Sequence, residues 1–178
     1  MRVTVSGPPG SGKTTVARLV AKRLGFELIA TGKIFRNQAK EAGMDVHKYN
    51  ELAERDATID RDLDDKIVRI ARSKDNIVLE GRLAGQLLNR NRIGAFRVFV
   101  TASIRTRAER IARRERTRPL DELKSLQSRE ESERRRYLEY YNIDIGDLSV
   151  YDLVVDSNDI TAEECSDIIL RELRKMKS

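Results

Sequence analysis

Short apolar runs alternate along the chain with longer segments in which apolar residues recur every three or four positions. The short runs predict buried β-strands, and the periodic segments predict amphipathic helices. Strands are expected over residues 2–6, 26–29, 76–79, 96–101 and 150–155. Helices are expected over residues 13–24, 31–41, 45–55, 60–73, 83–89, 103–116, 119–141 and 161–175. This alternation predicts an α/β fold in which a parallel sheet is covered on both faces.

The segment that joins the first predicted strand to the first predicted helix carries a phosphate-binding pattern. Gly7-Pro8-Pro9-Gly10-Ser11-Gly12-Lys13-Thr14 fits G-x-x-x-x-G-K-[ST], with strand, loop and helix in the required order. Its glycines permit a tight turn that brings backbone N–H groups against phosphate oxygens. Lys13 is expected to reach the β- and γ-phosphates, and the Thr14 hydroxyl to ligate Mg²⁺, with Thr15 beside them. The chain is therefore expected to bind ATP at a five-stranded sheet of the P-loop NTPase type.

Composition narrows the class of protein. The 178 residues predict one domain, residues 1–178, and the single cysteine excludes a disulfide framework. No apolar run has the length of a membrane span, so a soluble, cytoplasmic protein is expected. The net charge is +6, and seven of the fourteen residues from Arg105 to Arg118 are arginine. Aromatic residues for base stacking are scarce, which favours an anionic transition state over a nucleic-acid polymer. A nucleic-acid-associated ATPase remains the alternative from another class.

Two further arginines follow other strands of the predicted sheet. Arg36 lies about one and a half turns into the helix after the second strand, and Gly81-Arg82 follows the third strand. Ligands of open parallel sheets gather at the carboxyl ends of the strands. Gly81 permits close backbone approach, and a guanidinium binds phosphate through two parallel hydrogen bonds. These positions predict a second, phosphate-bearing substrate next to the nucleotide.

The chain resembles the nucleoside monophosphate kinases, and among them the short cytidylate kinases of the archaeal type. Four segments carry the resemblance, which spans nearly the whole chain. They are the acceptor-phosphate segment Ala30-Thr31-Gly32-Lys33-Ile34-Phe35-Arg36, the segment Leu79-Glu80-Gly81-Arg82, the root of a lid at Arg107-Ala108-Glu109-Arg110, and the lid segment Arg129-Glu130-Glu131-Ser132-Glu133-Arg134-Arg135-Arg136. In the last segment, glutamates stand where the family pattern has aspartates.

This resemblance implies a phosphotransferase that moves the γ-phosphoryl of MgATP to CMP or dCMP and yields ADP and CDP or dCDP. It implies nucleoside-monophosphate-binding helices over about 31–73 and a lid over about 110–142. Lys13, Arg110, Arg129 and Arg136 are expected around the transferring group. The acceptor is expected to contact Thr31, Gly32, Phe35, Arg36, Gly81 and Arg82. A monomer with small-molecule substrates, and without nucleic-acid or membrane partners, is expected.

Several residues depart from related patterns or leave their roles open. Leu83 stands where bacterial cytidylate kinases usually carry an acidic residue. Adenylate kinases typically continue Asp-Gly-Phe-Pro-Arg, and shikimate kinases carry Asp-x-Asp after the second strand. This chain lacks both, but both kinases remain alternatives. Glu80 is expected either to orient water on Mg²⁺ or to pair with Arg82 or Lys13. The acidic run at residues 60–65 is expected on a solvated helix face.

Overall fold

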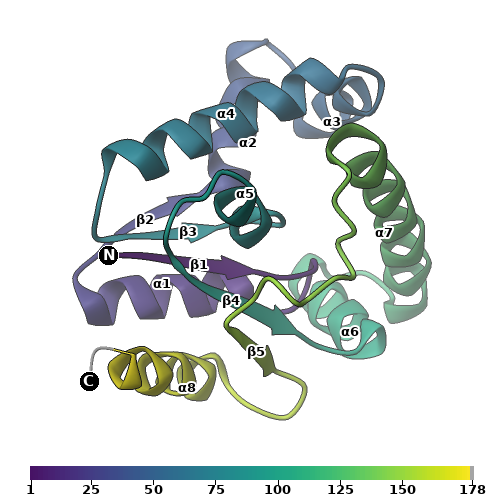
Figure 1. Ribbon diagram of the computed structural model, residues 1–178. Coiled ribbons are helices and arrows are strands. Elements are labelled where there is room, and N and C mark those ends of the chain that lie inside the picture. Colours follow the sequence, from purple (N-terminus) through teal and green to yellow (C-terminus); the bar gives the residue numbers. More distant parts are fainter. Residues whose placement is uncertain (177–178) are drawn as a thin grey trace.

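The five strands of the computed structural model form one sheet in the order β2-β3-β1-β4-β5, with every neighbouring pair parallel (Figure 1). Residues 1–176 are described, with only the backbone at His47. The strands are β1 Arg2–Ser6, β2 Glu27–Ala30, β3 Ile77–Glu80, β4 Phe96–Thr101 and β5 Leu153–Asp156. The expected five-stranded parallel sheet is confirmed, and β1 with its phosphate-binding loop lies at its centre.

The helices follow the apolar periodicity closely, and their ends differ where a capping residue intervenes. Asp56 accepts a hydrogen bond from the Thr58 amide at 2.9 Å, so the fourth helix starts three residues earlier than expected. The expected capping box at Thr161 and Glu164 is confirmed. The helices are α1 Lys13–Leu24, α2 Thr31–Glu41, α3 Val46–Arg55, α4 Ala57–Ser73, α5 Ala84–Arg90, α6 Ile104–Glu115, α7 Pro119–Tyr141 and α8 Ala162–Lys175.

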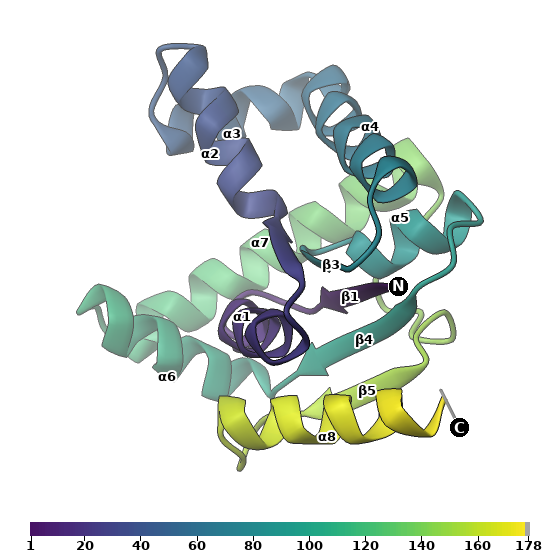
Figure 2. The ribbon, with the colours of Figure 1, turned by 90° about the vertical axis from the view of Figure 1, so that its left-hand side faces the viewer.

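Two apolar layers cover the sheet, one on each face (Figure 2). On one face, α1 and α8 bury a cluster that includes Val20, Val98 and Ile169. On the other face, α4 and α5 bury a second cluster that includes Ile67 and Leu88. Because both faces are covered, β3 is buried at every position and β1 at every position but the first.

The strand register places the functional loops at one edge of the sheet. Glu80 of β3 lies opposite both Ala30 of β2 and Val5 of β1. The chain therefore leaves these three neighbouring strands at the same level, where the phosphate-binding loop, α2 and the Gly81 turn begin. The helical pair α6–α7 stands at this edge as well (Figure 1).

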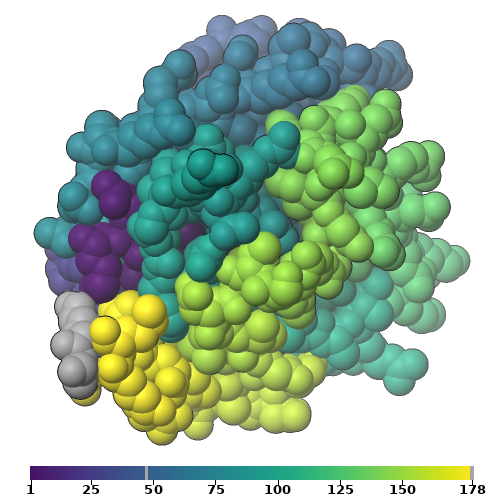
Figure 3. Space-filling model, viewed as in Figure 1, coloured from purple at the N-terminus to yellow at the C-terminus, as the bar shows by residue number. Residues whose placement is uncertain are grey.

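The end of α7 packs against the turn and helix that follow β3. Tyr137 and Tyr141 pack against the small cluster of Leu83, Leu87 and Ile143. The surfaces of α7 and of the α3–α4 region meet at the upper right of Figure 3. None of the helices in the described part of the chain combines the length and the apolar character that a membrane crossing needs.

The core position of Ile169 yields a stability prediction. Its side chain is fully buried between α8 and the sheet, whereas the adjacent Ile168 is only partly buried. Ile169→Ala is expected to lower the free energy of unfolding by about 2–5 kcal/mol, because it leaves a cavity in a close-packed layer. Ile168→Ala serves as the matched control, with a smaller loss in urea titration. Equal losses in the two variants would contradict this packing.

Candidate active site

A cavity of about 850 Å³ opens at the carboxyl edge of the sheet, within the size range of small-molecule sites. It is lined by residues of the phosphate-binding loop, of the turns after β2 and β3, and of α6 and α7. The predicted site residues that line it are Pro9, Gly10, Gly12, Lys13, Thr14, Thr15, Thr31, Gly32, Arg36, Gly81, Arg82, Arg110 and Arg129. The structure therefore brings most of the expected donor and acceptor residues to one hollow.

Five predicted residues are not among those that line the cavity: Gly7, Pro8, Ser11, Phe35 and Arg136. Ser11 is buried beneath the loop, where its carbonyl accepts a hydrogen bond from a serine hydroxyl after β5. The Phe35 ring packs against a tyrosine of α3, with 5.0 Å between the ring centroids. Phe35 thus contributes to the packing between α2 and α3.

A close contact with Arg107, rather than the approach of a ligand, explains why position 10 is a glycine. A Cβ on Gly10 would lie 2.8 Å from the Arg107 carbonyl oxygen, and the φ of Gly10 is +80°. Gly12 differs, since its φ is +86° and a Cβ there would meet no atom within 4 Å. The sequence interpretation attributed the glycines to the approach of phosphate. The structure adds that the loop is packed tightly against α6 at Gly10.

Lys13 and Thr14 share the carboxylate of Glu80 at the floor of the cavity. The Thr14 hydroxyl donates to Glu80 Oε1 at 3.2 Å, and Lys13 Nζ lies 3.9 Å from the same oxygen. Lys13 Nζ also donates to the Pro8 carbonyl at 3.4 Å. Burial lowers the pKa of Lys13, and Glu80 opposes that shift. Of the pairings left open for Glu80, the structure has the one with Lys13.

At the turn after β3, Arg82 is held by carboxylates of α7. Its Nε lies 2.7 Å from Glu133 Oε2, and its Nη2 lies 3.9 Å from Glu130 Oε1. The preceding Gly81 packs closely on Thr31, where an added Cβ would lie 2.2 Å from the threonine hydroxyl. The ends of β2 and β3 are therefore locked together next to the guanidinium.

Glu133 is the buried centre of this ion-pair network. Burial alone would raise the pKa of its carboxyl, but the guanidinium of Arg82, together with Arg129 and Arg136, outweighs burial and lowers it. Arg129 donates from Nε to Glu133 Oε1 at 2.8 Å. Glu133 therefore stays ionised and keeps several arginines in fixed positions.

Two arginines of α6 differ in what they hold. Arg107 is almost completely buried, and it donates to the carbonyls of Ala102 at 3.0 Å and Pro9 at 3.2 Å and to Glu130 at 2.6 Å. Arg110 lines the cavity and donates to the Ser157 hydroxyl at 3.0 Å. Arg107 thus fixes the phosphate-binding loop to the helical pair α6–α7, a role that the sequence interpretation missed.

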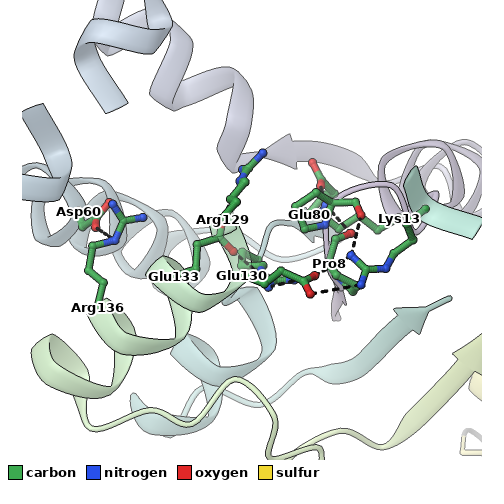
Figure 4. Close-up of polar contacts among 11 residues, drawn as sticks. Pro8, Lys13, Asp60, Glu80, Arg129, Glu130, Glu133 and Arg136 are labelled. Atoms are coloured by element: carbon green, nitrogen blue, oxygen red, sulfur yellow. Dashed lines mark hydrogen bonds and ion pairs between the residues drawn. The ribbon is translucent and has the colours of Figure 1, made fainter. Parts of the chain in front are cut away.

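Arg136 lies away from the cavity, at the far end of a row of charged side chains (Figure 4). Its Nε lies 3.4 Å from Asp60 Oδ2, and Asp60 belongs to α4. To reach its expected place around the transferring group, Arg136 would have to separate from Asp60. The solvated-face expectation for residues 60–65 is wrong for Asp60 and Asp64, because both side chains are partly buried where α4 meets α7.

Other cavity-lining residues follow from helical spacing. Arg18 lies four residues after Thr14, and Arg114 lies four residues after Arg110. Residues four apart share a helix face, so each could have been placed beside its predicted neighbour from the sequence. Within residues 1–176, no group of three or more carboxylate, histidine or cysteine side chains is arranged to hold a metal ion.

Comparison with known families gives a match over most of the chain. The sequence model of the Cytidylate kinase-like family matches residues 2–159. The chain is 45% identical over 170 residues to a cytidylate kinase of Methanosarcina mazei, covering 95% of this chain and 94% of that protein. It is 40% identical over 178 residues to a cytidylate kinase of Methanocaldococcus jannaschii, covering 99% of each chain.

Solved structures with the same fold are more distant in sequence. A shikimate kinase from Acinetobacter baumannii, solved in complex with shikimate, has a TM-score of 0.66 at 19% identity, over 99% of this chain and 94% of that one. A protein from Eubacterium ventriosum has a TM-score of 0.74 at 18% identity, over 98% of each chain. These similarities support the P-loop kinase fold that the sequence predicted.

Asp64 yields a prediction on pH. Burial raises the pKa of Asp64 to about 7, opposed by the Tyr141 hydroxyl and reinforced by Asp60 and Asp65. A carboxyl with a raised folded-state pKa stabilises the fold below its unfolded pKa, and that stability is lost as the pH rises through about 7. Asp64→Asn is therefore expected to melt higher than the wild type at pH 8, by about 3 °C or more, with a smaller gap at pH 5.

Thermal unfolding at both pH values measures this effect. Asp62→Asn, on the exposed side of the same helix, is the matched control and should show no such pH-dependent gain. A gap between Asp64→Asn and the wild type that stays constant from pH 5 to pH 8 would contradict the prediction.

Proposed function

The chain belongs to the cytidylate kinase-like family, and from this premise we propose that it transfers the γ-phosphoryl of MgATP to CMP or dCMP. The products are ADP and CDP or dCDP. The observation that carries the proposal is a single cavity with a phosphate-binding loop on one side and the arginines of a second anion site on the other. Arg36 and Arg82 form that second site.

The donor side binds the triphosphate of ATP. The loop N–H groups and the N-terminus of α1 face the phosphates, and Lys13 neutralises the charge of the β- and γ-groups. The lowered pKa of Lys13 has burial as its main cause, and a bound triphosphate would favour its protonated form.

Mg²⁺ fits the oxygen donors at the start of α1. The Thr14 hydroxyl and the Glu80 carboxylate are hard oxygen groups 3.2 Å apart, the ligand type that Mg²⁺ prefers. Thr14 would ligate the ion, and Glu80 would hold one of its waters. When bound, Mg²⁺ offsets negative charge on the β- and γ-phosphates.

The acceptor side places a nucleoside monophosphate opposite the donor. Arg36 and Arg82 bind its phosphate, with Thr31, Gly32 and Gly81 close to the same turn. The phosphate of the acceptor is already ionised, so the reaction needs positioning and charge stabilisation rather than a general base. Acceptor binding at Arg82 competes with Glu133 for the same guanidinium.

Arginines of the helical pair complete the site. Arg110 and Arg129 line the cavity and close over the transferring phosphoryl group as α6 and α7 approach the loop. Their closure excludes water, which would otherwise hydrolyse ATP. Residues 31–73 form the acceptor-binding part and residues 110–142 the lid of one domain, which acts as a cytoplasmic monomer.

The shikimate kinases share the fold at 19–23% identity, whereas relatives at 40–47% identity are named cytidylate kinases. The sequence likeness therefore favours a nucleotide acceptor over shikimate. The likeness also disfavours a nucleic-acid-associated ATPase. The phosphates of two small molecules account for the arginines of α6 and α7 that line the cavity.

An assay of ADP release, with each nucleoside monophosphate in turn and no nucleic acid present, tests the function. CMP or dCMP is expected to give multiple turnovers, and Lys13→Ala is expected to lower the rate about 100-fold or more, because it removes charge from the moving phosphoryl. Lys22→Ala, on the exposed far end of α1, is the matched control. Unchanged turnover in Lys13→Ala, or no turnover of the wild type with any monophosphate, would reject the proposal.

Arg82→Lys tests the acceptor site without leaving Glu133 beside a neutral residue. An ammonium lacks the planar fork of a guanidinium, so the KM for CMP is expected to rise about tenfold while the KM for ATP stays unchanged. Steady-state kinetics with each substrate varied in turn measures both constants. A rise confined to the KM for ATP would place Arg82 on the donor side instead.

A further inference from the structure

Eight lysine and arginine residues line the cavity, and they differ in whether the protein gives them a polar partner. Five of them are held by a carboxylate, a carbonyl or a hydroxyl group: Lys13, Arg82, Arg110, Arg114 and Arg129. The other three are exposed and make no hydrogen bond or ion pair with the described side chains and backbone: Arg18, Lys33 and Arg36. We call these three residues the unpaired cations.

The unpaired cations belong to two helices on one side of the cavity. Arg18 is on α1, whereas Lys33 and Arg36 are three residues apart on α2, the spacing of neighbours on a helix surface. Neither of these two helices, which the structure describes in full, contributes a carboxylate to the lining. Glu115 and Glu122 line the cavity from α6 and α7, which lie to the lower left of α2 in Figure 2. The side formed by α1 and α2 therefore carries positive charge that the protein does not compensate.

The first turn of α2 adds to this positive charge. Ala30 supplies no capping side chain at the N-terminus of α2, and no acidic residue occupies the first turn. A helix N-terminus carries partial positive charge, so the ammonium group of Lys33 is in an unfavourable position there. The charge of Arg36, its neighbour on the helix surface, repels it as well. A bound phosphate would offset both costs, because the amides of a helix N-terminus and the two cations all attract an anion.

Arg82, the other arginine of the proposed acceptor site, is already occupied. Its Nε lies 2.7 Å from Glu133 Oε2, and both side chains are largely buried. An acceptor phosphate must therefore displace Glu133 before it can use this side of the guanidinium. No carboxylate has to leave Lys33 or Arg36 first. The unpaired cations are thus available to an arriving phosphate before Arg82 is.

We infer that Arg18 and Lys33, together with Arg36, form an entry site that captures the phosphate of the nucleoside monophosphate before Arg82 exchanges Glu133 for it. This inference rests on the proposed function. The phosphate first binds the unpaired cations and the amides of α2. It then reaches Arg82, and Glu133 gives up its contact with that guanidinium.

Capture by exposed charge has a kinetic signature that a purely structural role lacks. Attraction between an exposed cationic surface and an anion speeds their association, and salt weakens it because the Debye length is about 10 Å at 0.1 M ionic strength. The value of kcat/KM for CMP is therefore expected to fall as NaCl is added to the wild type. The part of that salt dependence that comes from the entry site should disappear when one of its charges is removed.

Lys33→Gln tests the inference in assays of kcat/KM at low salt, about 0.02 M NaCl, and at high salt, about 0.3 M NaCl. At low salt the kcat/KM for CMP is expected to be about tenfold below that of the wild type, and at high salt the gap should narrow. The kcat/KM for ATP should stay unchanged at both salt concentrations. Lys33→Arg keeps the charge and is expected to retain the wild-type values. Arg18→Gln should act in the same direction as Lys33→Gln.

Lys40→Gln is the matched control, because it makes the same change of charge on α2 at an exposed position outside the cavity lining. It is expected to keep the wild-type kcat/KM for CMP at both salt concentrations. An equal fall in Lys40→Gln and Lys33→Gln would assign the effect to net charge and overturn the inference. A fall in Lys33→Gln that is the same at both salt concentrations, or that is confined to ATP, would also overturn it.

The wild type separates this inference from the proposed function. A wild-type protein that phosphorylates none of the monophosphates removes the function, and the inference with it. Turnover of CMP by the wild type, beside a Lys33→Gln variant with the same kcat/KM at low salt, removes the inference alone.

Discussion

The contact between Arg82 and Glu133 is the interaction on which the site depends. It joins the turn after β3, next to the central strand, to the long helix α7, with 2.7 Å between Nε and Oε2, and both side chains are largely buried. Removing either partner from a buried ion pair leaves a charge without compensation, which costs about 3–5 kcal/mol. The arginine beneath α7 therefore stabilises the helix in this position.

The position of α7 affects the whole site, because the charged residues of this helix share one face. Arg129, Glu133 and Arg136 are separated by four and three residues, the spacing of neighbours on a helix surface. One of these side chains lines the cavity, one is buried against Arg82, and one faces α4. A shift of α7 along its axis would thus displace side chains at the cavity, at Arg82 and at α4 together.

Local pattern was sufficient to predict much of the fold and part of the site. The strand–loop–helix order at residues 2–24 specified the phosphate-binding loop, and the apolar runs specified five parallel strands. The helix starts that differed depended on single side chains such as Asp56, whose capping hydrogen bond carries no apolar signal. The arginines at 36 and 82 were found because they follow strands, and strand ends converge at one edge.

The other site residues could not be placed from the sequence. Their positions depend on which helices pack against each other, and no local pattern encodes that. The acidic run of α4 reads as a solvent face in the sequence, yet Asp60 and Asp64 face inward because α7 folds back over that helix. In the sequence, Arg107 is one of seven similar arginines between residues 105 and 118. In the structure, it is buried and donates a hydrogen bond to the Pro9 carbonyl. Both cases require the packing of α6 and α7, which only the three-dimensional arrangement supplies.

The bonds of Arg107 also bear on how the chain folds. Its guanidinium links α6 to a carbonyl 98 residues earlier in the sequence and to a carboxylate 23 residues later. Contacts between such distant segments form only after the intervening chain has been ordered, because its loop-closure entropy must first be overcome. We therefore expect the phosphate-binding loop to gain its final shape late, after the first strand and helix have formed.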